Sequence, residues 1–166
     1  MNSDQITDIL ERAVAPRYKF LGVFARDKVP RVRSFPSCFV ANTRDSDHRG
    51  EHWVAFIYHS PRSIEFFDSY ALTPSDYGFK IRASIMSHKP LHWFSSIVCG
   101  QYCILFLYAR SHGLTLSRFL GKFSASDSHW NDEQVARIVH TQFGFGKFHS
   151  HCLCNQSCMS RNHCTH

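Results

Sequence analysis

The amino end of the chain carries the hydrophobic pattern of a helix. Its apolar residues recur with the spacing of one helical face, and they are Ile6, Ile9, Leu10, Ala13 and Val14. Ser3 can cap this helix, and Pro16 cannot continue it. The pattern predicts an amphipathic opening helix.

Three short apolar segments further along the chain predict strands. They are residues 38–41 (CFVA), 52–58 (HWVAFIY) and 63–68 (SIEFFD), and the polar loop 42–50 separates the first two. The last two follow each other closely enough to form a hairpin. With the turn centred on Ser60, His52 would lie opposite Asp68 on the same face of the hairpin.

Two more helices are expected in the second half of the chain. Residues 99–112 are apolar on nearly all sides, as in a buried helix, and residues 131–143 form an amphipathic segment opened by Asn131, Asp132 and Glu133. This order of elements, a helix, then strands, then a buried helix and a last helix, predicts an α+β fold. We expect a small mixed or antiparallel sheet packed on a buried central helix. We expect one domain over residues 1–147.

Charge is concentrated near the amino end. The chain has 166 residues and a net charge of +6, and one stretch contains seven basic residues opposed only by Asp27. Such a stretch, interleaved with aromatic residues, predicts a salt-dependent, non-specific contact with nucleic acid; the alternative is a solvated face. The seven residues are Arg12, Arg17, Lys19, Arg26, Lys28, Arg31 and Arg33.

The chain contains neither a long apolar segment nor a signal-peptide pattern at its start, so we expect no membrane contact and no secretion. Seven cysteines, an odd number, favour reduced thiols over a disulfide framework. Four of them lie in a Cys/His-rich tail, residues 148–166. Their spacing is not that of a zinc site, so we expect no metal there and a mobile tail.

Cys99 is the candidate nucleophile. It precedes Gly100 at the predicted start of the buried helix, where free N–H groups and the helix dipole favour a thiolate. Gly100 would also allow a substrate backbone to approach closely. Cys103, one turn later, fits the core. A nearby His52, oriented by Asp68, could serve as the base, although such a pair is also common in purely structural roles.

Several motifs in this order resemble the adenain-like cysteine proteases, which include the adenovirus maturation protease and its relatives in Maverick/Polinton elements. The motifs are Asn-Thr before the polar loop, Gly-x-His-Trp, Phe-Asp-Ser-Tyr, Ser-x-x-Cys-Gly and the FLG segment near the start. The resemblance extends from Ile6 to Phe143. It implies the adenain/Ulp-like fold, with Cys99 as nucleophile, His52 as general base and Asp68 as the group that orients it.

The same resemblance implies a wider function. It suggests a viral or mobile-element endopeptidase that cleaves virion precursor proteins in the virion and host nucleus, with DNA as an activator and with no cofactor required for the chemistry. The oxyanion would be held by the N–H of Cys99 and by a side chain upstream. Two alternatives remain: a SUMO- or ubiquitin-like deconjugating protease, and a non-catalytic DNA-binding protein derived from such a protease.

Three departures from the family pattern bear on this interpretation. His92 stands where the family usually has the glutamine of the oxyanion hole, and Ala71 stands where Phe-Asp-Ser-Tyr is usually followed by glycine. Between Cys38 and Cys99 there is no cysteine to link an activating peptide of the adenovirus type. A neutral imidazole at His92 can still donate one hydrogen bond.

Overall fold

The structure is a computed structural model and describes residues 1–144. The Cys/His-rich tail, residues 148–166, lies outside these residues, and so do the predictions that it is mobile and binds no metal. Residues 145–147, the end of the predicted domain, lie outside them as well.

Five strands form one mixed sheet in the order β1-β2-β3-β4-β5. The inner pairs β2–β3 and β3–β4 are antiparallel, whereas β1 and β5 each run parallel to their neighbour. The strands are β1 (Lys19–Phe24), β2 (Ser37–Asn42), β3 (Trp53–Ser60), β4 (Ser63–Phe67) and β5 (Ile85–Met86).

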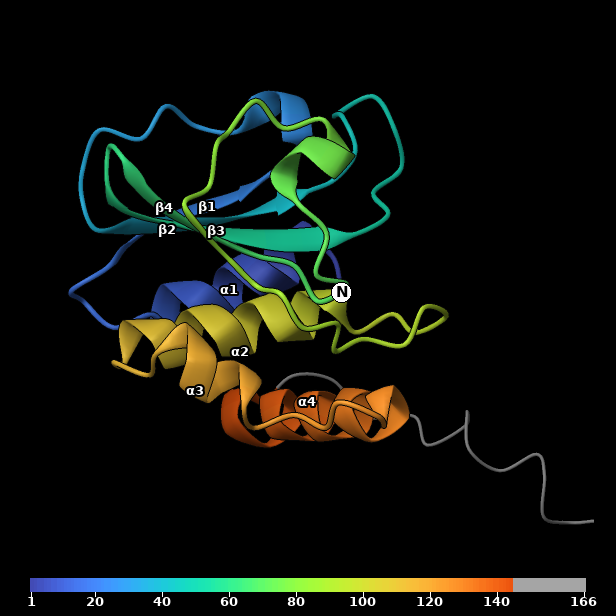
Figure 1. Ribbon diagram of the computed structural model, residues 1–166. Helices are drawn as coiled ribbons and strands as arrows, with labels where there is room; N and C mark the ends of the chain where they lie inside the picture. Colours follow the sequence, from blue (N-terminus) through green and yellow to red (C-terminus); the bar gives the residue numbers. More distant parts are fainter. Residues whose placement is uncertain (145–166) are drawn as a thin grey trace, which may run out of the picture.

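Helices α1 and α2 cover one face of the sheet, and α4 packs on α2 from beneath (Figure 1). The other face is covered by loops and by two 3-10 turns, η1 and η2. The elements are α1 (Ser3–Ala13), α2 (Cys99–Ser111), α3 (Leu116–Leu120), α4 (Ser128–Phe143), η1 (Arg26–Lys28) and η2 (Pro74–Tyr77). This arrangement confirms the predicted α+β fold with a sheet packed on a central helix.

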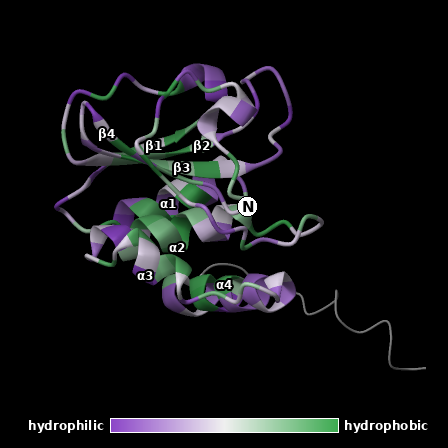
Figure 2. Cartoon of the chain, viewed as in Figure 1, coloured by the Kyte–Doolittle hydropathy of each residue, from purple (hydrophilic) through white to green (hydrophobic). Residues whose placement is uncertain are grey.

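Apolar residues fill both sides of the sheet, and the outer loops are mostly hydrophilic (Figure 2). On the helix side, Phe67 stacks on Phe106 of α2 with ring centroids 4.4 Å apart. On the loop side, Phe39 stacks on Phe56 at 5.0 Å. Because both faces are covered, β2 is buried along its whole length, which explains the apolar residues Cys38 to Ala41 at its centre.

The opening helix begins as predicted but with a different cap. Asn2, not Ser3, accepts the N–H of Gln5 at 2.9 Å, and the Gln5 side chain accepts the N–H of Asn2 in return. This reciprocal capping box satisfies two free donors of the first turn. Helix α4 likewise begins at Ser128, three residues before its predicted start, with Asp127 as its cap.

The predicted hairpin forms, but its register differs by two residues. Phe56 pairs with Phe66 instead of Ile64, and the strands join at Ser60 and Ser63 after an irregularity next to Tyr58. A shift of two residues keeps every side chain on its predicted face, because side chains alternate with a period of two. His52 and Asp68 therefore remain on one face, each one residue beyond a strand end.

A buried ion pair fixes α2 to the sheet. Glu65 on β4 is fully buried and accepts two hydrogen bonds from Arg110, at 2.7 Å each. The imidazole of His59 lies 2.8 Å from the same carboxylate. Pairing of this kind offsets the cost of burying a charge, and it joins the far end of α2 to the centre of β4.

Candidate active site

His52 and Asp68 form a buried pair at the open end of the β3–β4 hairpin. The His52 Nε2 atom lies 2.6 Å from Asp68 Oδ1, and the two residues are 7% and 0% exposed. This contact fixes the orientation of the imidazole and leaves the other ring nitrogen, Nδ1, for a second partner.

The Asp68 carboxylate is held by three further donors. Oδ1 also accepts the N–H of Tyr70 at 3.1 Å, and Oδ2 accepts the N–H of Leu72 and the hydroxyl of Tyr77, both at 2.9 Å. Ser87, next to β5, accepts the N–H of Asp68 and donates to its carbonyl. So many donors keep the carboxylate in one position.

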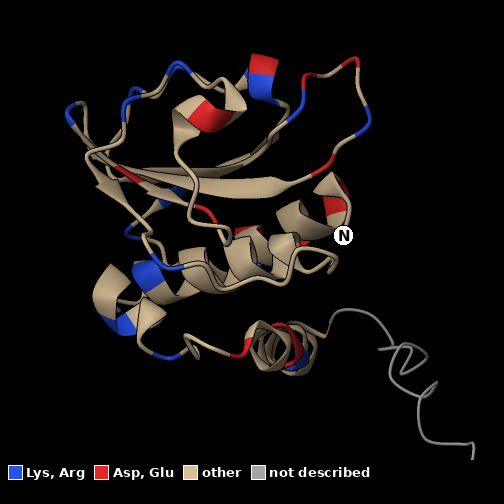
Figure 3. Cartoon of the chain, turned by 45° about the vertical axis from the view of Figure 1, so that its right-hand side comes forward, with Lys and Arg blue, Asp and Glu red and all other residues tan. Residues whose placement is uncertain are grey.

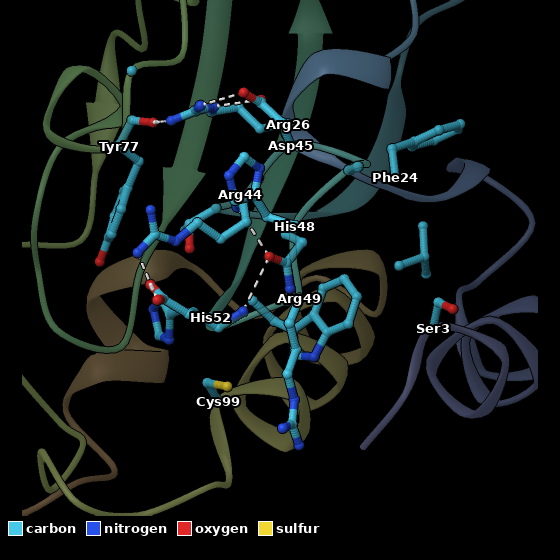
Figure 4. Close-up of a pocket in the computed structure, with 18 of the residues that line it drawn as sticks. Ser3, Phe24, Arg26, Arg44, Asp45, His48, Arg49, His52, Tyr77 and Cys99 are labelled. Carbon is cyan, nitrogen blue, oxygen red and sulfur yellow. Dashed lines mark hydrogen bonds and ion pairs between the residues drawn. The ribbon is translucent and has the colours of Figure 1, made fainter.

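The third group, Cys99, is the first residue of α2. No side chain caps this helix at Val98, and the His52 imidazole and the backbone N–H groups of Trp53 and Gly100 lie around its sulfur. Burial alone would raise the pKa of the thiol, but the His52 contact and charge and these N–H groups lower it below its usual value. Figure 4 shows Cys99 beneath His52 in the same cleft.

The pKa of His52 shifts in the opposite direction. Burial would lower its pKa, but the hydrogen bonds and charges of Asp68 and Cys99 outweigh burial and raise it to about 9. A thiol with a lowered pKa beside an imidazole with a raised pKa favours a thiolate–imidazolium pair.

Asn42 and Gly50 explain why the sequence places His52 here. Asn42 is buried at the end of β2, and its side-chain oxygen accepts the N–H groups of Arg44 and Glu51 at the two ends of the polar loop. Gly50 packs so closely that an added Cβ would lie 2.6 Å from the Asn42 amide nitrogen. The Asn-Thr and Gly-x-His-Trp motifs thus form one clamp on the loop that leads into His52.

Gly100 packs closely against the amino end of the chain, a role in addition to the expected substrate approach. A Cβ at this position would lie 3.2 Å from Ile6 and 3.3 Å from Met1, so Gly100 makes room for the amino end of the chain. This packing role was not predicted, because no local pattern indicates that α1 begins next to α2.

His92, the predicted oxyanion residue, is buried beside the site. Its Nδ1 atom lies 3.0 Å from Asp132 Oδ1, and its ring centroid is 6.5 Å from that of His52. Asn131 and Asp132 were predicted as helix-opening residues, but both are buried inside α4, where Asn131 holds the carbonyl of Leu91 at 3.1 Å. They anchor the segment before the nucleophile.

The site opens into a cleft of about 1430 Å³. One wall is the polar loop, with Arg44, His48 and Arg49, and the other contains the exposed side chains of Phe94 and Ile97, which are 85% and 81% exposed. Such a wide, open cleft suits an extended polypeptide chain better than a small molecule.

The seven basic residues of the predicted stripe do not form one surface. Arg17 donates to the carbonyls of Ser111 and Arg110 at the end of α2, and Arg26 forms an ion pair with Asp45 at 2.6 Å. Arg12 and Lys19 are exposed on α1 and β1, whereas Lys28 ends η1, and Arg31 and Arg33 lie in the following loop, which packs on the other face of the sheet. Figure 3 shows Lys and Arg side by side with acidic residues around the sheet and helices. The basic residues lie apart because strand β1, which was not predicted, lies within this stretch of sequence.

The predictions about reduced cysteines and membrane contact can be compared with residues 1–144. Cys38, Cys99 and Cys103 are free thiols, and Cys103 is fully buried, as predicted. Burial raises the pKa of Cys38 to about 12, which separates it from Cys99. Among residues 1–144, no helix is long and apolar enough to span a bilayer.

Four residues of the site escaped the sequence reasoning. Tyr70 stacks on His52 with centroids 4.6 Å apart, and Tyr77, Ser87 and Asp132 hold the neighbouring polar groups. Tyr70 lies inside the Phe-Asp-Ser-Tyr motif, which could have pointed to it. The other three come from separate segments with no local signal.

Comparison with known proteins supports the fold. No protein-family model and no curated protein matches the sequence. Among solved structures, the chain is similar to the selenomethionine form of ASFV pS273R protease, with a TM-score of 0.56 and 16% identity. The match covers 79% of this chain and 65% of that one, so the chain spans less than two thirds of that protease's length. The two proteins share a fold.

Proposed function

We propose that this chain is a cysteine endopeptidase of the adenain/Ulp type. The observation that supports this most strongly is the buried contact series Asp68–His52–Cys99, assembled from three separate segments at the mouth of a polypeptide-sized cleft. The sulfur lies at a helix start, which is where a thiolate is favoured. Similarity to a solved protease of the same fold supports the same conclusion.

The mechanism follows from the protonation states. The Cys99 thiolate attacks the scissile carbonyl carbon, and the negative oxygen that forms is held by the free N–H of Cys99 at the start of α2. The tetrahedral intermediate collapses as the His52 imidazolium gives its Nδ1 proton to the leaving amine. Neutral His52 then takes a proton from water, which attacks the thioester and releases the acid product and the thiolate.

The proposed substrates are virion precursor proteins of the virus or mobile element that encodes the chain. The exposed apolar side chains of Phe94 and Ile97 next to the nucleophile offer contacts for apolar residues of an extended substrate. A SUMO-type deconjugating protease would use the same three residues, and only its substrates would differ.

The test is proteolysis by the full chain. Wild type, Cys99→Ala and, as a matched control, Cys103→Ala are incubated with denatured capsid precursors and with ubiquitin-like conjugates, and new amino termini are identified by mass spectrometry. We expect precursor cleavage by wild type and the control only. Equal cleavage by Cys99→Ala would refute the nucleophile, and cleavage of conjugates alone would favour the deconjugating alternative.

We also propose that DNA binds the loop side of the sheet, on a narrower surface than the predicted stripe. In the loops 29–33 and 79–83, apolar residues pack on the sheet and alternate with exposed basic residues that form neither hydrogen bonds nor ion pairs within residues 1–144. They are Arg31, Arg33, Lys80 and Arg82. A row of free cations of this kind suits a phosphate backbone.

Salt-dependent DNA binding measured by fluorescence anisotropy tests this surface. We expect the double variant Lys80→Glu/Arg82→Glu to weaken DNA binding at least tenfold. The double variant Lys122→Glu/Arg137→Glu changes the charge equally on the helix side and should leave DNA binding nearly unchanged. Equal loss in both double variants would contradict the proposed surface.

A further inference from the structure

The polar loop that leads into His52 leaves one of its charged residues without a partner. Arg49 is exposed, and its guanidinium makes no hydrogen bond and no ion pair within residues 1–144. An arginine side chain is always positively charged in proteins, so the loop presents one uncompensated cation. The other charged side chains of residues 44–51 have partners, and the pairs are Arg44–Glu51, Arg26–Asp45 and Asp47–His48, each at 2.6 Å.

The backbone that carries Arg49 is held in place. Gly50, the next residue, packs so closely on Asn42 that an added Cβ would lie 2.6 Å from the Asn42 amide nitrogen. Glu51 donates its N–H to the side-chain oxygen of Asn42 at 3.3 Å. The Arg49 side chain therefore extends from a fixed position close to His52 in the sequence, and its backbone needs no further ordering when a ligand binds.

The Arg49 side chain points into the cleft of the candidate active site. Arg49 lines the same cleft as Cys99, and Figure 4 shows its side chain running down from the loop on the side of Ser3, away from Tyr77. The lining side chains around Ser3 and Phe24 are uncharged, and they include those of Met1, Asn2, Val23 and Ala25. A negative group that enters this side of the cleft meets a cation and no lining carboxylate.

The acidic residues that line the cleft do not neutralise Arg49. Asp45 and Glu51 are each held by another arginine at 2.6 Å. Asp76 lies on η2, on the other side of the loop, and its carboxylate accepts the N–H and the hydroxyl of Thr73, both at 2.7 Å. The charge of Arg49 is therefore available to a ligand.

A carboxylate of the substrate is the ligand that suits Arg49. A guanidinium matches a carboxylate with two parallel hydrogen bonds. Phe94 and Ile97 are exposed on the opposite wall, so a polypeptide in the cleft meets an apolar wall and a cationic wall. A phosphate backbone would also attract a guanidinium, but the polypeptide is the ligand that must enter this cleft to reach Cys99.

We propose that the cleft selects polypeptide substrates with an acidic residue, Asp or Glu, close to the scissile bond, and that Arg49 binds the carboxylate of that residue. The inference rests on the proposed protease function and adds a substrate class to it. An ion pair of this kind is present in the substrate complex and in the transition state alike, so its loss raises KM and leaves kcat nearly unchanged. Salt should weaken the ion pair, because the guanidinium is exposed.

Cleavage of a peptide library from a digested proteome measures the preference directly. The full chain is incubated with the library, and new termini are identified by mass spectrometry. A preferred peptide is then synthesised with an acid at the enriched position and with the corresponding amide in its place. We expect Asp or Glu to be enriched at one position near the cleaved bond. The acidic peptide should have a KM about three- to tenfold lower than the amide peptide, and the difference should shrink at high salt.

Substitutions of Arg49 separate substrate binding from a structural role. Arg49→Gln should bring the acidic-to-amide ratio of kcat/KM close to one, and Arg49→Glu should reverse the preference, so that a lysine at the same position is favoured over an acid. Arg62→Gln is the matched control, because Arg62 is also exposed and lies at the turn between β3 and β4, at the other end of the hairpin from His52. It should keep the wild-type ratio. The rate of Cys99 alkylation by chloroacetamide reports whether the site is intact in each variant.

Three results would overturn the proposal. They are a set of cleaved peptides without acidic enrichment, an acidic-to-amide ratio that Arg49→Gln leaves at the wild-type value, and an equal loss for both peptides with slower Cys99 alkylation, which would assign Arg49 to structure. If the wild-type chain cleaves no peptide, the protease proposal fails and the substrate preference is refuted with it. Normal cleavage without an acidic preference refutes only the role of Arg49.

Discussion

Replacing Asp68 by asparagine removes the negative charge against which His52 is held. The substitution preserves the size of the side chain, but an amide cannot accept hydrogen bonds at both of its ends. Asp68 receives the His52 ring at 2.6 Å on one oxygen and the Leu72 N–H and Tyr77 hydroxyl on the other. Whichever way the amide turns, its NH₂ group meets a donor, so the variant loses charge and contacts together.

The size of the effect follows from the His52 pKa. This pKa is raised from 6.5 to about 9, a difference that corresponds to about 3 kcal/mol in favour of the imidazolium. Without the Asp68 charge, burial of the ring opposes only the Cys99 contribution. We therefore expect the pKa of His52 to fall to 6.5 or below, and kcat/KM at neutral pH to fall by roughly 10² to 10⁴.

The stability of the fold should change with a defined pH dependence. Because the folded-state pKa of His52 lies above the unfolded value, its contribution is complete below pH 6.5 and is lost as the pH rises through about 9. The Asp68→Asn variant should therefore be most destabilised relative to wild type near pH 6. The difference should shrink toward pH 9, where only the lost hydrogen bonds remain.

NMR titration of His52 and urea denaturation at several pH values measure both quantities. Asp76→Asn is the matched control, because the Asp76 side chain completes the capping box of η2 with Thr73, its only side-chain hydrogen-bond partner in residues 1–144. It should leave the His52 titration unchanged. A His52 pKa that stays near 9 in Asp68→Asn would show that Asp68 does not set the charge of the imidazole.

Three further substitutions test the framework. Ala71 has φ +60°, so Ala71→Gly should raise the free energy of unfolding by up to about 1 kcal/mol; a lower melting temperature would contradict this. Gly50→Ala brings a Cβ within 2.6 Å of Asn42, so it should cost about 1–3 kcal/mol and slow Cys99 alkylation, and wild-type values for both would refute the clamp. Arg110→Leu leaves the buried Glu65 carboxylate with His59 as its remaining partner, with an expected loss of up to about 3–5 kcal/mol in urea denaturation, which an unchanged midpoint would exclude.

Local hydrophobic patterns were sufficient to predict the helices that such patterns mark directly. The apolar spacing from Ile6 to Ala13 and the apolar segment that begins at Cys99 were sufficient for α1 and α2. Strand β1 was missed because its basic neighbours suggested a surface stripe and because Gly22, with φ +120°, interrupts its register with β2. Strand β5 has only two residues, and it exists because Glu65 and Phe66 provide backbone partners distant in sequence.

Part of the site was also predictable from local patterns. His52 and Asp68 meet despite the wrong register, because the two-residue shift preserved the face on which both side chains lie. The contact of His92 with Asp132 could not be foreseen, since it joins positions forty residues apart through the packing of α4 on α2. Long-range polar contacts leave no periodic trace in a sequence.

The ionisation of Cys99 is the decisive quantity. The rate of Cys99 alkylation is measured against pH for wild type and His52→Ala, with peptide mapping to separate Cys99 from the other cysteines. We predict that wild-type Cys99 reacts as a thiolate below its usual pKa of 9.0, and that removing His52 returns its titration to that value or above. A wild-type Cys99 that titrates as an ordinary thiol, unaffected by the loss of His52, would contradict the thiolate–imidazolium pair and the protease built on it.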